Sequence, residues 1–187
     1  MKQQNTKNNI AEVFFVLLSE RYFDKITVRD IVEECGVTRN TFYYYFEDIY
    51  DIIDDSLQRE IRKVILAGRG KRISLEHLLE PIVKFFTENK KIAIHLFKSS
   101  KKDEICSYIE KAIRSAIDHY VGDIPGSDRV SDFDRAIIVD FYSFAVMGLF
   151  NQWITTGMRG NPTERVLRAG VLFENSMKKA VEKGCLG

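Results

Sequence analysis

The stretch TRNTFYYYF, residues 38–46, brings together side chains that suit contact with nucleic acid. Arg39 can donate two hydrogen bonds to the edge of a guanine, and Asn40 can pair with the edge of an adenine. The hydroxyls of Tyr43 and Tyr44 can donate to phosphate oxygens, and their rings can pack against a sugar or a thymine methyl group. These groups can act together only if one element presents them on one face.

Five consecutive aromatic residues cannot share one face of a helix, because each step turns the side chain by about 100°. Phe42 and Phe46 return to nearly the same side. We expect them to pack against Ile31, Val37 and a first helix. The opposite face then carries Asn40, Tyr43 and Tyr44, with Arg39 near its boundary.

The residues before this stretch predict a second short helix. Thr27 is followed three residues later by an aspartate, which is the spacing of a capping box, so a helix over 28–34 is expected. Gly36 stands where a tight turn needs a residue that tolerates positive φ. Thr38 can then cap a helix over 39–45. Two short helices joined by such a turn are typical of a helix-turn-helix.

In a helix-turn-helix the second helix enters the major groove of DNA, and backbone N–H groups at the helix starts can hold phosphates. Arg29 is a further phosphate candidate. The alternative is that the aromatic run only packs, since a helix-turn-helix shape also occurs as a plain structural element. The candidate DNA-binding residues are Thr27, Arg29, Thr38, Arg39, Asn40, Tyr43 and Tyr44.

Nearly every other segment has helical period and none alternates like a strand, which predicts an all-α protein of about nine helices. A first helix carries one apolar stripe: Ile10, Val13, Phe14, Leu17 and Leu18. Later helices are expected to start at Asp48 and Ser74, the second with a kink or late start at Pro81. The others are expected over 90–97, 104–121, 132–156 and 162–183, the last with Asn161 as its cap.

Composition excludes several classes of protein. The three cysteines and three histidines are scattered without metal-ligand spacing. There is no Ser/His/Asp grouping or phosphate loop, so we expect no enzyme, no metal and no cofactor. No apolar run approaches the roughly 18 residues of a membrane span. Glu12 interrupts the apolar run that faintly resembles a signal peptide, so a cytoplasmic protein is expected.

The charge of the N-terminal region is unfavourable for DNA. The whole chain has a net charge of +1, but residues 2–60 hold seven basic and twelve acidic side chains, a net of −5. Lys2 and Lys7 could form a flexible arm over the DNA backbone. We predict modest non-specific affinity and a shallow dependence on salt, because few phosphates would be neutralised.

Two late helices, 132–156 and 162–183, carry apolar residues at helical spacing together with glycines that permit close approach. We expect them to pair with their symmetry mates in an isologous four-helix interface. The alternative is an intramolecular hairpin in a monomer. The candidate interface residues are Phe141, Phe144, Gly148, Trp153, Gly170, Val171, Phe173 and Met177.

The middle of the chain is rich in large aromatic residues, which either fill a core or line a cavity. If they line a cavity, a mainly apolar or aromatic ligand is expected. The candidates for such a site are Phe97, Tyr108, Phe141 and Tyr142.

The segment TVRDIVEECGVTRNTFYYYFEDIYDII resembles the DNA-binding domain of the TetR family of transcriptional regulators, most closely the branch of dihydroxyacetone-kinase-linked regulators. The resemblance is specific over about residues 8–55, and the pattern from Gly148 to Glu164 is similar to the last two helices of many members. The matching residues are Thr27, Val28, Ile31, Gly36, Val37, Thr38, Thr41, Phe42, Tyr43 and Phe46.

The resemblance implies a homodimer that binds a palindromic operator, with a DNA-binding domain over 1–47 and an effector-binding and dimerisation domain over 48–187. Effector binding would change the spacing of the two DNA-reading domains, and most members are repressors while some are activators. Two residues depart from the family pattern. Tyr22 stands where the family often has glycine at the end of the first helix, and this residue requires either a different turn or some backbone strain. Ile49 replaces a lysine that commonly contacts a phosphate. With the acidic charge, Ile49 motivates the alternative of an adaptor that acts through a protein partner.

Overall fold

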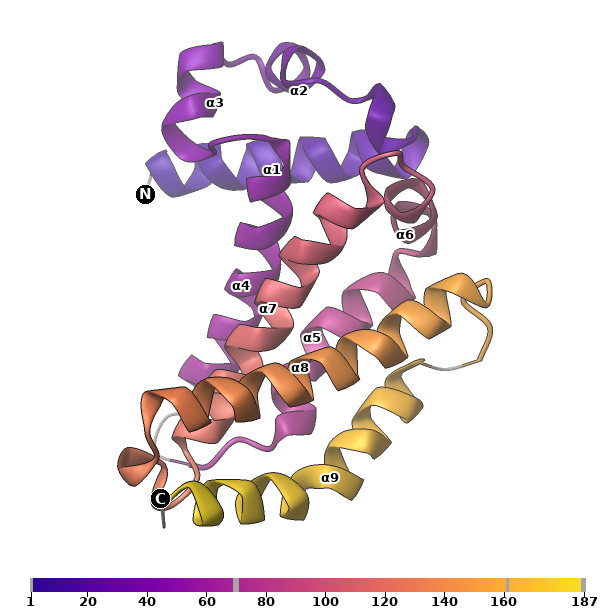
Figure 1. The fold of residues 1–187 in the computed structure, drawn as a ribbon. Helices are drawn as coiled ribbons and strands as arrows, with labels where there is room; N and C mark the ends of the chain where they lie inside the picture. Colours follow the sequence, from indigo (N-terminus) through magenta and orange to yellow (C-terminus); the bar gives the residue numbers. More distant parts are fainter. Residues whose placement is uncertain (1, 69–70, 161, 186–187) are drawn as a thin grey trace. The chain divides into compact units, whose positions relative to one another are not determined.

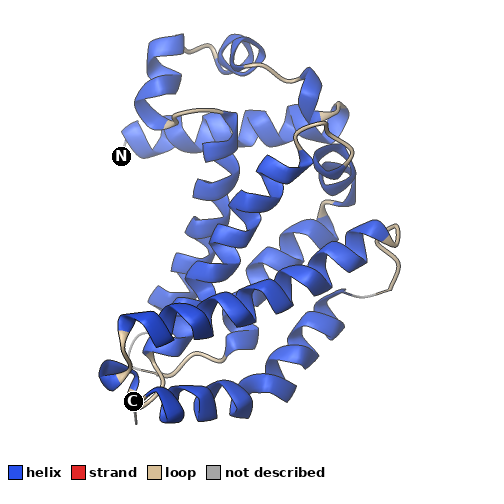
Figure 2. Ribbon diagram, viewed as in Figure 1, coloured by secondary structure: helices blue, strands red, loops and turns tan. Residues whose placement is uncertain are grey.

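The computed structural model describes residues 2–68, 71–160 and 162–185, and throughout these ranges the regular elements are helices (Figure 2). The all-α prediction is therefore confirmed. In chain order the elements are α1 (Lys2–Glu20), η1 (Phe23–Lys25), α2 (Val28–Cys35), α3 (Arg39–Tyr45), α4 (Ile49–Ala67), α5 (Leu75–Glu88), α6 (Lys90–Phe97), α7 (Lys102–Gly122), η2 (Ser127–Arg129), α8 (Asp132–Thr155) and α9 (Pro162–Gly184), as labelled in Figure 1.

The helix starts follow the caps that the sequence predicts. The hydroxyl of Ser131 accepts the backbone N–H of Asp134 at 3.1 Å, and a carboxylate oxygen of Asp48 accepts that of Asp51 at 2.9 Å. Such caps satisfy N–H groups that have no partner within the helix. α5 begins at Leu75 and runs through Pro81, so the late start considered for it does not occur. The predicted Asn161 cap lies outside the described residues.

The chain divides into two compact units, residues 1–56 with 88–109, and residues 57–87 with 110–187. We call them unit 1 and unit 2. This division differs from the predicted boundary at residue 47, because α6 and the start of α7 pack with the N-terminal helices. Among the described helices, none is long and apolar enough to cross a membrane.

Unit 1 is held together by the apolar stripe of α1. Ile10, Phe14 and Leu18 are fully buried, and α1 packs against both α2 and α6. Tyr22, after the end of α1, has φ −63° and ψ 146°, which is ordinary extended backbone. The missing glycine is therefore accommodated by a different turn, the short helix η1, and not by strain.

Unit 2 contains the pair α8 and α9, which lie side by side (Figure 1). Its core includes Phe86 and Phe150, whose ring centroids are 5.0 Å apart. The ring centroid of Trp153, the single tryptophan of the chain, lies 5.9 Å from that of Phe150. Tyr120 of α7 is fully buried and donates a hydrogen bond to Glu174 of α9 at 3.0 Å. Burial of the phenol raises the pKa of Tyr120 to about 12.

Candidate nucleic-acid interface

Helix α3 is anchored by one side only. Phe42 and Phe46 are fully buried, with ring centroids 5.9 Å apart. They are four residues apart and so fall on the same side of the helix. Ile31 of α2 is also fully buried, and α2 packs against α3. The predicted inward direction of the two phenylalanines is confirmed, and the other side of α3 is left to solvent.

The turn between α2 and α3 fixes the angle between the two helices. Gly36 has φ 65° and ψ 31°, the left-handed conformation that glycine adopts without a Cβ penalty. The N–H of Val37 donates to the carbonyl of Val32 at 3.0 Å, which closes the end of α2. The hydroxyl of Thr38 then accepts the N–H of Thr41 at 3.1 Å and starts α3.

The outward face of α3 carries the predicted polar residues. Arg39 and Asn40 are exposed in the first turn, and within the described part of the chain their side chains have no hydrogen-bond or ion-pair partner. Tyr43 is also exposed, and Tyr44 is 69% exposed. Arginine and asparagine are the side chains that best read guanine and adenine edges. Their placement thus leaves these side chains in solvent on the outward face of an anchored helix.

The remaining predicted contacts lie beside this face. Thr27 is exposed and engaged in the capping box of α2, where its N–H donates to Asp30 at 2.8 Å. Arg29 is exposed and its Nε donates to Glu33 at 2.7 Å. An exposed pair of this kind contributes little free energy. Arg29 can therefore exchange Glu33 for a phosphate, although it does not start from a free state.

The acidic residues of unit 1 are largely used within the fold. Asp55 pairs with Lys7 at 2.6 Å, and Lys7 also lies 5.1 Å from the centre of the Phe46 ring. Lys7 therefore belongs to α1 and not to a flexible arm, while the side chain of Lys2 lies outside what the structure describes. Asp30 caps α2, and Asp54 is buried. These carboxylates thus have structural roles, and the net charge of −5 over residues 2–60 remains unfavourable for DNA.

Sequence reasoning missed the role of α6 in supporting this surface. The ring Nδ1 of His95 is 2.6 Å from the carbonyl oxygen of Leu18, near the end of α1, and the same ring packs edge-on against Tyr22 at 4.7 Å. Farther along, Tyr50 stacks on Tyr108 with centroids 5.6 Å apart and planes 8° from parallel. The local sequence does not predict these contacts, because the partners are far apart in the chain.

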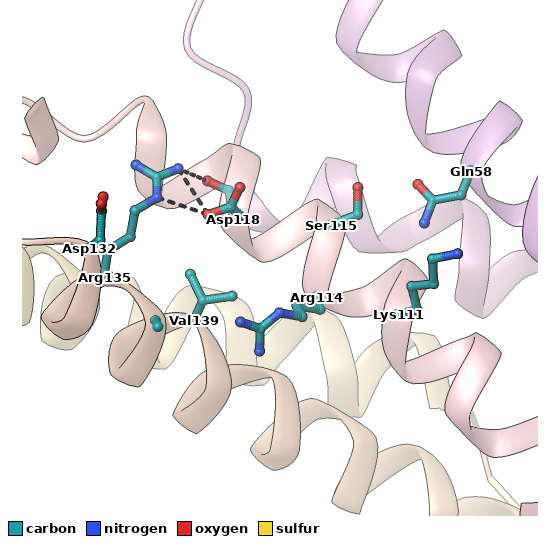
Figure 3. A pocket seen from close by; sticks show the side chains of 9 residues that line it. Gln58, Lys111, Arg114, Ser115, Asp118, Asp132, Arg135 and Val139 are labelled. Atoms are coloured by element: carbon teal, nitrogen blue, oxygen red, sulfur yellow. Dashed lines mark hydrogen bonds and ion pairs between the residues drawn. The ribbon is translucent and has the colours of Figure 1, made fainter.

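The four aromatic residues predicted for an effector site are divided between the two units. Phe97 and Tyr108 belong to unit 1, whereas Phe141 and Tyr142 belong to unit 2. Phe141 is exposed, and Tyr142 is buried and donates a hydrogen bond to Ser176 at 2.9 Å. None of the four lines the two pockets described for unit 2, one of which Figure 3 shows, and the lining residues of both are mostly of polar or charged types. An aromatic effector site formed by these residues therefore stays a prediction.

The candidate dimer residues also separate into two groups. Phe141, Phe144 and Gly148 lie exposed along α8, in line with exposed Phe133 and Ile137, which complete the stripe at helical spacing. Space around Gly148 is open, because a Cβ added at this residue would meet no other atom within 4 Å. On α9, Val171 and Phe173 are each about half exposed.

Three other members of the predicted interface point inward. Trp153 is 3% exposed, Met177 is 0% exposed, and Gly170 is buried. Five residues after Gly148, Trp153 has turned about 140° away from the exposed stripe. These three residues belong to the core of unit 2 and cannot form the outer face of α8 and α9.

A helix-turn-helix whose second helix is exposed is the arrangement that many DNA-binding transcriptional regulators use. Residues 15–55 match the family described as bacterial regulatory proteins, tetR family. Residues 74–175 match the family described as transcriptional regulator C-terminal region, TetR_C_8. Together these matches show that the chain belongs to the TetR family of transcriptional regulators.

Solved structures share the fold at low sequence identity. The dihydroxyacetone kinase operon activator DhaS is 19% identical, with a TM-score of 0.63 over 93% of this chain and 96% of that chain. A TetR transcriptional regulator from Streptococcus agalactiae 2603V is 22% identical, with a TM-score of 0.52 over 92% of this chain and 94% of that chain.

One relative is similar in sequence. The HTH-type transcriptional regulator YxbF of Bacillus subtilis (strain 168) is 31% identical over 55 residues, which are 29% of this chain and 14% of YxbF.

Proposed function

We propose that the protein is a cytoplasmic, homodimeric repressor that binds a palindromic operator and releases it when a small molecule binds unit 2. The observation that carries the DNA-binding part is the state of Arg39 and Asn40. Both are exposed, and neither side chain has a partner among the residues that the structure describes, on a helix anchored by Phe42 and Phe46. Arg39 would pair with a guanine edge and Asn40 with an adenine edge. Tyr43, Tyr44, Thr27, Thr38 and Arg29 would hold the backbone.

The exposed stripe of α8 supports the dimer. Phe133, Ile137, Phe141 and Phe144 stand on one side of a helix, and a contiguous exposed apolar surface of this kind marks an interaction site. Gly148 continues the stripe and lets a second helix approach closely. Leu172 and Phe173 of α9 add further exposed apolar surface. An isologous interface built on these helices would present two reading helices to a palindromic site.

The experiment is selection of binding sites from a pool of random DNA duplexes with the full-length protein. We expect enrichment of one palindromic sequence that also occurs beside the protein's own coding region. A reporter gene placed behind this site should be less active when the protein is present. Higher reporter activity in the presence of the protein would show that it is an activator and not a repressor. Activation is the role that the name of DhaS states for that protein. Failure to enrich any sequence would contradict specific DNA binding.

A second candidate function is an adaptor that keeps the fold and acts through a protein partner. It is favoured by the net charge of −5 over residues 2–60 and by the pairing of Arg29 with Glu33. An adaptor would enrich no operator, and substitution of Arg39 would leave its activity unchanged. Site selection therefore separates the two functions.

A further inference from the structure

One charged residue stands in the apolar stripe of α1. Lys7 precedes Ile10, Phe14 and Leu18 by three, seven and eleven residues, so at about 100° per residue all four fall on one side of the helix. The three apolar residues are fully buried, and the side chain of Lys7 is only 25% exposed. Lysine is rarely buried unless it is paired. This position in the stripe therefore requires a partner.

The partners of Lys7 lie on two other helices of unit 1. Its Nζ is 2.6 Å from Oδ1 of Asp55 on α4, whose side chain is 16% exposed. The same Nζ lies 5.1 Å from the centre of the Phe46 ring, which is within the range of a cation–π contact. Phe46 is the C-cap of α3, and its N–H donates to the carbonyl of Phe42 at 3.0 Å. One ammonium group thus joins α1 to α4 and to the end of α3.

The two ends of α3 are held in different ways. At the start of the helix, Thr38 forms a cap through hydrogen bonds between near neighbours in the sequence. At its end the ring of Phe46 is fully buried, and Lys7 is the cation over that ring. Arg39 and Asn40 belong to the same seven-residue helix. A tilt or rotation at its end therefore changes where these two side chains point.

Stability alone is a weak reason for a charged pair at this place. Removing an ammonium and a carboxylate from water costs free energy that their attraction only partly returns, and apolar side chains of similar size often stabilise a protein equally well. An ion pair adds direction, because it is satisfied in one arrangement of its helices. Fixing the register of packed helices is the best-attested use of a buried polar group.

We propose that Lys7 is a positioning residue for α3. Together with Asp55 it holds the ring of Phe46, and so it sets the direction of Arg39 and Asn40. Lys7 acts through α3 and not through a phosphate, in contrast to the flexible arm that the sequence suggests. As a determinant of operator specificity, this inference rests on the proposed function. The effect of Lys7 on α3 does not, and it can be measured without DNA.

The first measurement is hydrogen exchange by mass spectrometry on the full-length protein without DNA. Lys7→Met keeps a long apolar side chain and removes the ammonium group. We expect faster exchange in peptides that cover residues 39–46, because the end of α3 opens more often when the ring of Phe46 is held less firmly. Lys7→Arg keeps the cation and should exchange as the wild type does. Lys98→Met removes the same charge from an exposed residue of unit 1 and should leave α3 unchanged.

The second measurement is fluorescence anisotropy with the selected operator and with a shuffled duplex, at a temperature where thermal unfolding shows every variant to be folded. The ratio of the two affinities should fall roughly fivefold or more in Lys7→Met and in Asp55→Asn, because a misplaced Arg39 loses part of the discrimination of a two-point base contact. The double variant should lose no more than Lys7→Met does, since the pair acts as a unit. Lys7→Arg and Lys98→Met should keep the wild-type ratio.

The outcomes separate positioning from other roles of Lys7. Unchanged exchange over residues 39–46 in Lys7→Met would overturn the proposal, as would equal losses of affinity for both duplexes. Equal losses at an unchanged salt slope would assign Lys7 to stability alone. Equal losses with a slope shallower by about 0.9 per subunit would make it a phosphate contact. If the wild type prefers no operator, the proposed function fails, and hydrogen exchange still decides whether Lys7 holds α3.

Discussion

Asp24 accepts a hydrogen bond from the hydroxyl of Ser99 at 2.8 Å, although 75 residues separate them in the sequence. Ser100 donates its backbone N–H to the same carboxylate at 3.1 Å and its hydroxyl at 3.0 Å. These bonds join η1 to the turn between α6 and α7 within unit 1. The N–H of Ser100 first, and then the hydroxyl of Ser99, lower the pKa of Asp24 below its ordinary value.

Loss of this carboxylate should make unit 1 less stable in a pH-dependent way. Because the pKa of Asp24 is lower in the folded state, its contribution is present above the unfolded pKa near 3.8 and is lost as pH falls through the folded value. Asp24→Asn should therefore lower the urea midpoint at pH 7, and the difference from wild type should shrink below about pH 4. Circular dichroism between pH 7 and pH 2.5 measures both.

Asp128→Asn is the control for this experiment, since Asp128 is an exposed carboxylate in η2. It should leave the midpoint nearly unchanged at every pH. Equal midpoints for Asp24→Asn and wild type at pH 7 would show that the contacts with Ser99 and Ser100 do not stabilise the protein.

Arg39→Ala should remove sequence preference and not merely affinity. A two-point contact to a base edge is worth about 1–3 kcal/mol of discrimination per half-site. Fluorescence anisotropy with the selected operator and with a shuffled duplex measures the ratio of the two affinities, which should collapse. Arg29→Ala is the comparison, since a phosphate contact should weaken both duplexes alike. If the ratio of the two affinities were unchanged in Arg39→Ala, Arg39 would not contribute to the recognition of base edges.

The salt dependence of operator binding should be shallow, and Ile49→Lys should steepen it. Ile49 is the first residue of α4, where the family commonly has a phosphate-binding lysine. One added phosphate contact per subunit changes the slope of log affinity against log salt by about −0.9, or about −1.8 for a dimer. Ile49→Gln, which adds no charge, should keep the wild-type slope. A wild-type slope as steep as about −10 would contradict the prediction.

Phe141→Asp should dissociate the dimer. Phe141 is 67% exposed in the single chain and stands in the middle of the α8 stripe, so a carboxylate there would be buried without a partner in the proposed interface. Sedimentation equilibrium at micromolar concentration should show monomers and the operator affinity should fall. Val16→Asp places the same charge at another exposed apolar residue, 57% exposed on α1, and should remain dimeric. If the Phe141→Asp variant remained dimeric, Phe141 would not be part of the dimer interface.

The residues in and next to α3 were sufficient to predict this helix. The caps at Thr27 and Thr38, the turn at Gly36 and the four-residue spacing of Phe42 and Phe46 are all interactions within a few residues. Interactions of this range depend mainly on residues a few positions apart in the chain, so these residues predict both helices.

The sequence by itself thus determined the helices, the family and the outward direction of Arg39 and Asn40. Tertiary structure decided which apolar faces of α8 and α9 are covered, because buried Trp153 and exposed Phe141 are both large aromatic side chains at helical spacing. Tertiary structure also brought Asp24 within hydrogen-bond distance of Ser99. These contacts depend on which distant segments pack together, and the spacing of residues along one helix carries no information about its neighbours.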